Sequence, residues 1–126
     1  MTYDVVALTE RAPDKLTLAA CMAHMDPGLR VRSAGGGAVV QLCDDDGEPL
    51  LSIEAAQRVE VEGEVERLLG PESTQGLSVP YWWVEARASR EGERPAALAR
   101  AFAEELVRLL GGRVWCERPV SPEGGR

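Results

Sequence analysis

The sequence predicts an α+β domain in which two main helices pack on one face of a mostly antiparallel β-sheet. Short segments rich in alternating or β-branched apolar residues recur along the chain, and turn-forming residues separate them. Two longer stretches have the period of a helix, one near each end. The 126 residues suit one ordinary core. We expect residues 1–118 to form a single domain and residues 119–126 to be a flexible tail.

The first elements are a strand and a helix. Residues 3–9 are short and apolar, which predicts a buried or half-buried strand. Pro13 suits the first turn of a helix, and Asp14 favours the positive end of its dipole. Apolar residues then recur at spacings of three and four, at Leu18, Cys21, Met22 and Met25. The run Asp26-Pro27-Gly28 ends this helix, and a short strand over residues 29–32 leads into a turn or loop over residues 33–37.

A hairpin and a further strand follow. Residues 38–43 and 49–54 are strand-like, and Gly47 between them tolerates the positive φ that a tight turn requires. Alternation over residues 57–62 predicts another strand, with Val59 and Val61 on one face. A short helix is expected over residues 64–69, ended by Gly70-Pro71.

The C-terminal half begins with a turn-rich stretch over residues 71–79, which we expect to be a mobile surface loop. The strand over residues 81–88 has an apolar face of Trp82, Val84, Ala86 and Ala88. The helix over residues 95–110 carries Leu98, Phe102, Leu106 and Leu109 along one stripe. Residues 113–116 form a short closing strand.

Charge and cysteine content exclude several classes of protein. The net charge is −7, and residues 44–72 hold ten acids against two arginines, a net of −8. This acidic balance argues against nucleic-acid binding and against anionic membrane surfaces. The longest apolar run is far shorter than a membrane span, so we expect no membrane insertion. Three cysteines without C-x-x-C spacing, and the lack of a secretory leader, favour the cytoplasm.

The motifs that carry known chemistry are missing. His24 is the single histidine, so zinc sites with several histidines are impossible, and it is expected to be an exposed imidazole at a helix end rather than a catalytic group. The acids of residues 44–48 do not have the register of a calcium-binding EF-hand loop. Gly35-Gly36-Gly37 precedes no helix that could bind phosphate. We therefore predict no catalytic, cofactor-binding or metal-binding residues, and the sequence favours a role other than catalysis.

The strand over residues 81–88 holds the candidate partner-binding residues. Tyr81, Trp83, Glu85 and Arg87 share its second, mixed face. If the two aromatic side chains face solvent, the four residues form a docking patch. The alternatives are that the 71–79 loop or the short helix covers the aromatics, and that Glu85 and Arg87 pair with neighbouring strands.

Four groups of segments carry a resemblance to a known family: residues 4–9 with 12–14, residues 38–43 with 51–54, residues 82–87, and residues 109–115. Together they resemble an uncharacterised actinobacterial (Streptomyces-type) domain family whose members lie near type VII secretion genes. The resemblance covers residues 3–116. A chain with thirteen arginines, one lysine and no asparagine also points to a high-GC source. The family implies a genomic context but no activity, cofactor or catalytic residue.

Two functions are compatible with these observations. The favoured one is a non-enzymatic protein-interaction domain, such as an adaptor or chaperone-like accessory of a secretion system, with a foreign protein or a second copy of the chain as its partner. The alternative is a small-molecule-binding or enzymatic domain with a pocket between sheet and helices, using Glu85, Arg87 and His24.

Overall fold

The computed structural model describes residues 3–25, 28–34, 39–89 and 92–117. In these residues the chain forms seven strands and three helices, in the order that the sequence predicts. Their bounds are β1 (Tyr3–Thr9), α1 (Lys15–His24), β2 (Arg30–Ala34), β3 (Val39–Cys43), β4 (Pro49–Glu54), β5 (Gln57–Val59), α2 (Glu64–Leu69), β6 (Tyr81–Ala88), α3 (Glu93–Leu110) and β7 (Gly112–Cys116).

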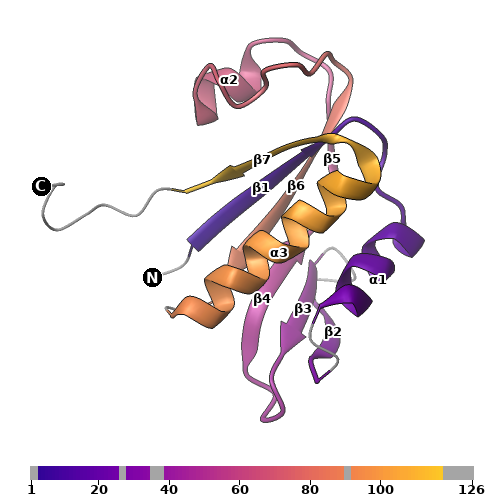
Figure 1. The fold of residues 1–126 in the computed structure, drawn as a ribbon, viewed down its shortest axis with the longest axis vertical. Coiled ribbons are helices and arrows are strands. Elements are labelled where there is room, and N and C mark those ends of the chain that lie inside the picture. The colour runs from indigo at the N-terminus through magenta and orange to yellow at the C-terminus, as the bar shows by residue number, and fades with distance from the viewer. Residues whose placement is uncertain (1–2, 26–27, 35–38, 90–91, 118–126) are drawn as a thin grey trace, which may run out of the picture.

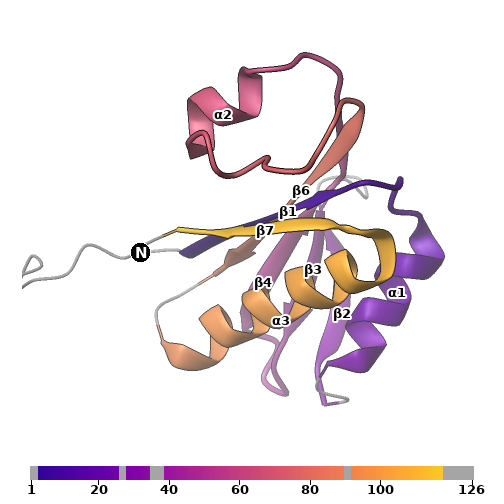
Figure 2. The same cartoon turned by 45° about the horizontal axis from the view of Figure 1, so that its top comes forward.

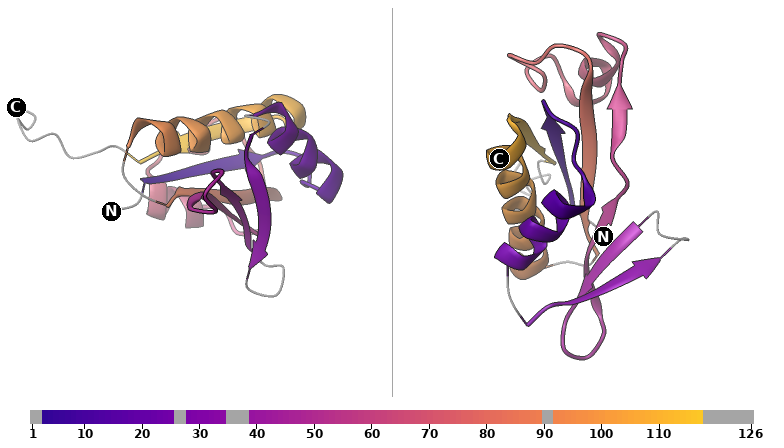
Figure 3. Two further views of the ribbon diagram at one scale, coloured as in Figure 1. Left: turned by 90° about the horizontal axis from the view of Figure 1, so that it is seen from below. Right: turned by 90° about the vertical axis from the view of Figure 1, so that its right-hand side faces the viewer.

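The strands form one antiparallel sheet in the order β2-β3-β4-β6-β1-β7, and β5 pairs with the first residues of β6. The two longer helices, α1 and α3, lie against each other on one face of this sheet (Figures 1 and 3). The predicted α+β class with two main helices on one face is therefore confirmed. The path β1-α1-β4-β6-α3-β7 follows the split β-α-β pattern of ferredoxin-like sheets, with β2 and β3 added beyond β4.

Each face of the sheet buries its own apolar cluster. On the helix side, Val5 and Ala7 of β1 and Val84 of β6 pack against Phe102 and Leu106 of α3. On the other side, Val6 and Leu8 of β1 and Tyr81 of β6 pack with Val59 and with Val65 of α2. Successive strand residues point to opposite faces, so β1 is buried on both sides.

The helix α2 covers only one end of the second face. It lies at the opposite end of the molecule from the β3–β4 hairpin (Figures 1 and 2). The acidic middle of the sequence is therefore divided in space. Four acids, at residues 44, 45, 46 and 48, surround the hairpin turn, and five, at residues 60, 62, 64, 66 and 72, lie around α2.

The hairpin turn forms as predicted. Gly47 has a φ of +82°, and its N–H donates to the carbonyl of Asp44 at 3.0 Å. The Asp44 carboxylate accepts hydrogen bonds from the backbone N–H groups of Asp46 and Glu48. These bonds give the acidic run a structural role in closing the turn.

Four predicted boundaries need correction. The strand β2 spans Arg30–Ala34, so Ser33 and Ala34 pair with β3 and do not belong to the predicted 33–37 loop. Pro13 lies before α1, and Asp14 is its N-cap, with a carboxylate that accepts the N–H of Thr17 at 2.7 Å. The strand β5 ends at Val59, and Val61 is 61% exposed instead of facing the core with it. The helix α3 begins at Glu93, which places Pro95 in its first turn. The predictions for residues 26–27, 35–37 and 119–126 lie outside the described residues.

None of the helices in the described ranges has both the length and the apolar character that a membrane crossing requires.

The connection from α3 to β7 depends on Gly112. Its φ is +132°, and a Cβ added there would overlap the carbonyl oxygen of Leu8 in the neighbouring β1. Gly63, before α2, also has a positive φ of +91°, but a Cβ added there would meet no atom within 4 Å. A side chain added at Gly63 would therefore introduce backbone strain alone, whereas one added at Gly112 would introduce both backbone strain and a steric clash.

We expect Gly112→Ala to lower the free energy of unfolding by more than about 3 kcal/mol, because β1 and β7 must separate to admit the methyl group. The matched change Gly63→Ala should cost only about 1 kcal/mol. Urea denaturation followed by circular dichroism measures both. Equal effects of the two substitutions would contradict the close approach of Gly112 to Leu8.

The thiol of Cys21 is enclosed between α1 and α3. Burial, with a smaller effect from the negative charge of Glu105, raises its pKa from 9.0 to about 11. A group with a raised pKa binds its proton more tightly in the folded state. Its contribution to stability is therefore complete below pH 9 and is lost as the pH rises to about 11.

We expect the free energy of unfolding to fall by up to about 3 kcal/mol between pH 9 and pH 11. In Cys21→Ala this thiol-dependent part of the slope should disappear, although the variant starts from a lower stability. Denaturation curves at several alkaline pH values provide the comparison. Parallel pH profiles for wild type and variant would show that the thiol is not the group responsible.

Candidate functional site

The four candidate residues of β6 lie on one face, as the alternation predicts. Arg87, Glu85 and Trp83 are paired in register with Asp4, Val6 and Leu8 of β1. Since Val6 and Leu8 belong to the cluster opposite the main helices, the candidate residues face away from α1 and α3. On this face of β6, Tyr81 at the α2 end is buried, whereas Trp83, Glu85 and Arg87 are only partly buried.

Tyr81 is buried, with 2% of its surface exposed. It lies in the cluster beneath α2 and the loop that follows it. This loop is anchored, because Ser73 and Thr74 are buried and Thr74 donates a hydrogen bond to the carboxylate of Glu66. Of the two alternatives left open for Tyr81, exposure to solvent and cover by the 71–79 loop or the short helix, the structure shows the second.

The Tyr81 hydroxyl lies in this interior without a hydrogen-bond partner among the described residues. Burial, together with the nearby charges of Glu66 and Glu62, raises its pKa above 10.0. The pKa of Glu66 shifts in the opposite direction, because the hydrogen bond that its carboxylate accepts from Thr74 lowers it. Tyr81 therefore contributes to the core through its ring.

The other three candidates form a hydrogen-bonded chain at the border of the covered region. The half-buried Trp83 places its Nε1 3.4 Å from Glu85 Oε1. Arg87 Nη2 donates to Glu85 Oε2 at 3.1 Å, and Arg87 Nε donates to Asp4 Oδ1 at 2.9 Å. The bond to Asp4, the larger effect, and the charges of both carboxylates raise the pKa of the Arg87 guanidinium. The alternative that both charges pair with neighbouring strands holds only for Arg87, which reaches Asp4 of β1, whereas Glu85 bonds to Trp83 and Arg87 of its own strand. Of the Arg87 side chain, 42% remains exposed.

Beyond this chain, a row of polar residues crosses the same face from the edge strand β2 to β1. In register, Arg32 of β2 lies opposite Gln41 of β3, Gln41 opposite Ser52 of β4, and Ser52 opposite Arg87. Arg32 donates to Gln41 Oε1 through Nε at 3.0 Å and Nη2 at 2.8 Å. Asp4 then continues the row into β1. This uncovered part of the sheet is called the open face below.

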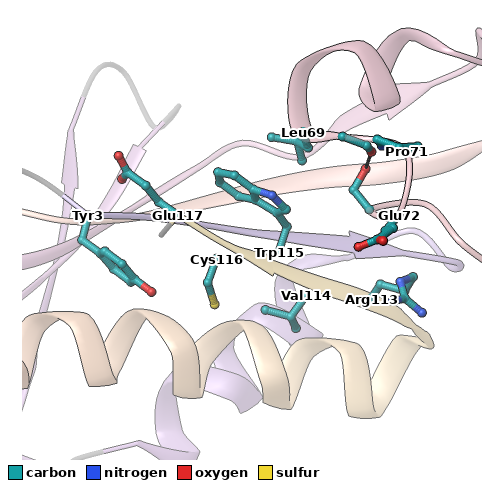
Figure 4. Close-up of a pocket in the computed structure, with 11 residues that line it drawn as sticks. Tyr3, Leu69, Pro71, Glu72, Arg113, Val114, Trp115, Cys116 and Glu117 are labelled. Carbon is teal, nitrogen blue, oxygen red and sulfur yellow. Dashed lines mark hydrogen bonds between the residues drawn. The ribbon is translucent and has the colours of Figure 1, made fainter. Parts of the chain in front are cut away.

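A cleft of about 910 Å³ lies along β7, outside the residues that the sequence singled out (Figure 4). Residues 69–73, at the end of α2 and just after it, form one wall, and β7 forms the other. Trp115 extends from β7 toward Leu69, whereas Val114 and Cys116 point toward α3 (Figure 4). The sequence alone does not reveal this cleft, because local patterns do not show which strand lies at the sheet edge.

The remaining chemistry-bearing side chains are dispersed. His24 ends α1 with 67% of its side chain exposed, and its Nε2 lies 3.8 Å from Glu105 Oε1. It is on the helix side of the sheet, so the structure does not bring it together with Glu85 and Arg87 on the opposite face. The three cysteines are unpaired. Within the described part of the chain, no cluster of three or more His, Cys, Asp or Glu side chains is placed to hold a metal ion.

Comparison with known proteins finds no match to this chain among protein-family models, curated proteins or solved structures.

The role of Tyr81 is tested by two substitutions. Tyr81→Phe retains the buried ring and removes a hydroxyl that bonds to no described group, so we expect the free energy of unfolding to change by less than about 1 kcal/mol. Tyr81→Ala empties the space beneath α2 and should cost about 3 to 5 kcal/mol. Urea denaturation of both variants is the measurement. A large loss in Tyr81→Phe would show that the hydroxyl has a partner that stabilises the fold.

Proposed function

We propose that the chain is a non-enzymatic protein-interaction domain that docks a folded partner on the open face. The observation that carries this proposal is the unequal covering of the sheet. Two helices pack on one face, where α3 contacts β1, β4, β6 and β7, whereas α2 covers only one end of the other face. Strands in this open region present ordered polar and charged side chains rather than a second apolar layer.

Charge on the open face indicates the chemistry of such a partner. The β2 end carries Arg30 and Arg32, both exposed. At the β1 and β6 end, the carboxylates of Asp4 and Glu85 flank Arg87. A complementary surface presents acidic groups over β2 and at least one basic group over β1. Such complementarity selects the partner and fixes its orientation more than it adds affinity.

Trp83 supplies the apolar part of the proposed contact. Its ring is half-buried between the covered and open regions, and its indole nitrogen is held by Glu85. A tryptophan with restricted motion loses little conformational entropy on binding, which is why such residues are frequent anchors at interfaces. The proposed contact therefore retains Trp83, Glu85 and Arg87 from the predicted patch and assigns Tyr81 to the core beneath it.

The resemblance to proteins encoded near type VII secretion genes supports a more specific proposal. In that context the domain acts as a cytoplasmic adaptor or chaperone-like accessory, holding a partner protein without altering it chemically. A polar face suits this role because it can bind and release a folded partner without exposing a large apolar surface in the free state.

The test compares partner capture by variants on opposite faces of the sheet. Arg87→Ala and Trp83→Ala change the open face, and Arg108→Ala is the matched control. Arg108 is an exposed arginine of α3 that is also paired with a carboxylate, Glu105, at 2.6 Å. We expect a specific partner from the source lysate to bind wild type and Arg108→Ala equally and to bind each open-face variant at least about tenfold more weakly.

Capture is quantified by mass spectrometry, and the selected protein is then purified and titrated against each variant. Thermal unfolding of all variants checks that the fold is retained. If Arg87→Ala and Trp83→Ala bind every partner of the wild type with unchanged affinity, the open face is not the docking surface.

A further inference from the structure

We propose that two copies of this chain associate through their β7 strands, which pair antiparallel and join the two sheets edge to edge. This interface lies at the cleft along β7, apart from the polar row of the open face. It therefore stands independently of the docking function proposed above.

The direction of the backbone groups of β7 shows which of them are free. The N–H of Glu117 donates to Asp4 O at 3.0 Å, and the N–H of Glu10 donates to Gly111 O at 2.9 Å. Odd-numbered residues of this segment therefore direct their backbone groups toward β1. The N–H and C=O groups of Val114 and Cys116 point the other way, toward an edge at which no described strand is paired.

The side chains of this edge are complementary to themselves. Arg113, Trp115 and Glu117 share one face, and Trp115 lies midway between the two opposite charges. When Trp115 lies opposite Trp115 of a second antiparallel copy, each Arg113 lies opposite the other copy's Glu117. Cross-strand pairs of opposite charge and of aromatic rings are the favourable combinations in antiparallel sheets.

The same register also satisfies the free backbone groups. Val114 then lies opposite Cys116 of the second copy, and both residues direct their N–H and C=O groups into the junction. Each of the two Val114–Cys116 pairs exchanges two hydrogen bonds. Trp115 and Arg113 fall in the pairs without hydrogen bonds, where opposing side chains approach most closely. A single two-fold axis between the tryptophans generates all of these contacts.

The opposite edge of the sheet lacks this complementarity. In β2, Arg30 and Arg32 share a face, and registers centred on Val31 or Arg32 place arginine against arginine. Like charges directly opposite each other disfavour pairing, which is a common way in which proteins protect an edge strand. In β7 the guanidinium of Arg113 is exposed and has no partner among the described residues. It is therefore available for an intermolecular ion pair.

The cleft supplies room for the second strand. It extends over both sides of β7, with residues 69–73 as a wall on the side of Trp115 and with Tyr3 on the side of Cys116. A strand added at about 4.8 Å from β7 places its own tryptophan beside this wall. By the two-fold symmetry, each copy offers its cleft to the other.

The test is a charge exchange measured by sedimentation velocity over concentrations from ~1 μM to ~1 mM, the range expected for so short an interface. Wild type should dimerise. Arg113→Glu and Glu117→Arg each place like charges opposite each other twice, and each should weaken the dimer at least about tenfold. The double variant Arg113→Glu/Glu117→Arg restores opposite charges and should return the dissociation constant to within about threefold of the wild-type value.

Arg30→Glu is the matched control, since Arg30 is an exposed arginine on the opposite edge strand and makes no ion pair in the described ranges. It should leave the dimer unchanged. Circular dichroism and the thermal midpoint check the fold of each variant, because Glu117→Arg removes an acceptor for the Asp4 N–H.

Three outcomes overturn the proposal. A wild type that is monomeric over the whole concentration range would exclude the dimer and would make a foreign extended peptide the candidate occupant of this edge. A dimer that is insensitive to both single substitutions, or is not restored by the double one, would exclude the proposed register. A dimer that is lost in Arg30→Glu would assign the interface to β2.

Discussion

The structure depends on the burial of β1 on both of its faces. Val5 and Ala7 contact the layer formed by α3, while Val6 and Leu8 contact the smaller cluster beneath α2. The strand is also paired on both sides, with β6 and with β7. A strand enclosed in four directions fixes the positions of its neighbours, so the orientation of β6 and the edge position of β7 both follow from it. The close approach of Gly112 to Leu8 belongs to this same constraint.

Local patterns predict most of the fold, because alternation and helical period are properties of neighbouring residues. The sequence alone predicts all ten elements in order and separates the two faces of β6 correctly. The errors have a common cause in long-range packing. Alternation places Tyr81 on the face away from the main helices, but only the return of residues 64–79 over that face buries it. Val61 continues the alternation of Val59, yet the chain has already left the sheet.

The candidate site was predictable only in part for the same reason. Residues that share one strand, such as Glu85 and Arg87, are placed together by parity. Asp4 and Arg32 are brought to the same face as Glu85 and Arg87 by pairings between strands far apart in the sequence. Local sequence patterns do not determine this strand order. The complementarity of Arg113 and Glu117 is visible in the sequence, but it has no meaning until β7 is known to be an edge strand. Chemical composition thus suggests which residues interact, whereas topology determines which surfaces they occupy.

The two proposed surfaces are compatible because of how edge pairing acts on a sheet. A two-fold axis between paired β7 strands runs perpendicular to the sheet, so corresponding faces of the two copies remain on the same side. Both open faces would then point in one direction, and both α1–α3 layers in the other. A partner with two equivalent contact regions would bind such a dimer with an effective concentration set by the fixed spacing of the two faces. A polar docking face gives only a weak contact by itself. Two such contacts, made together by the dimer, would suffice for stable capture of the partner.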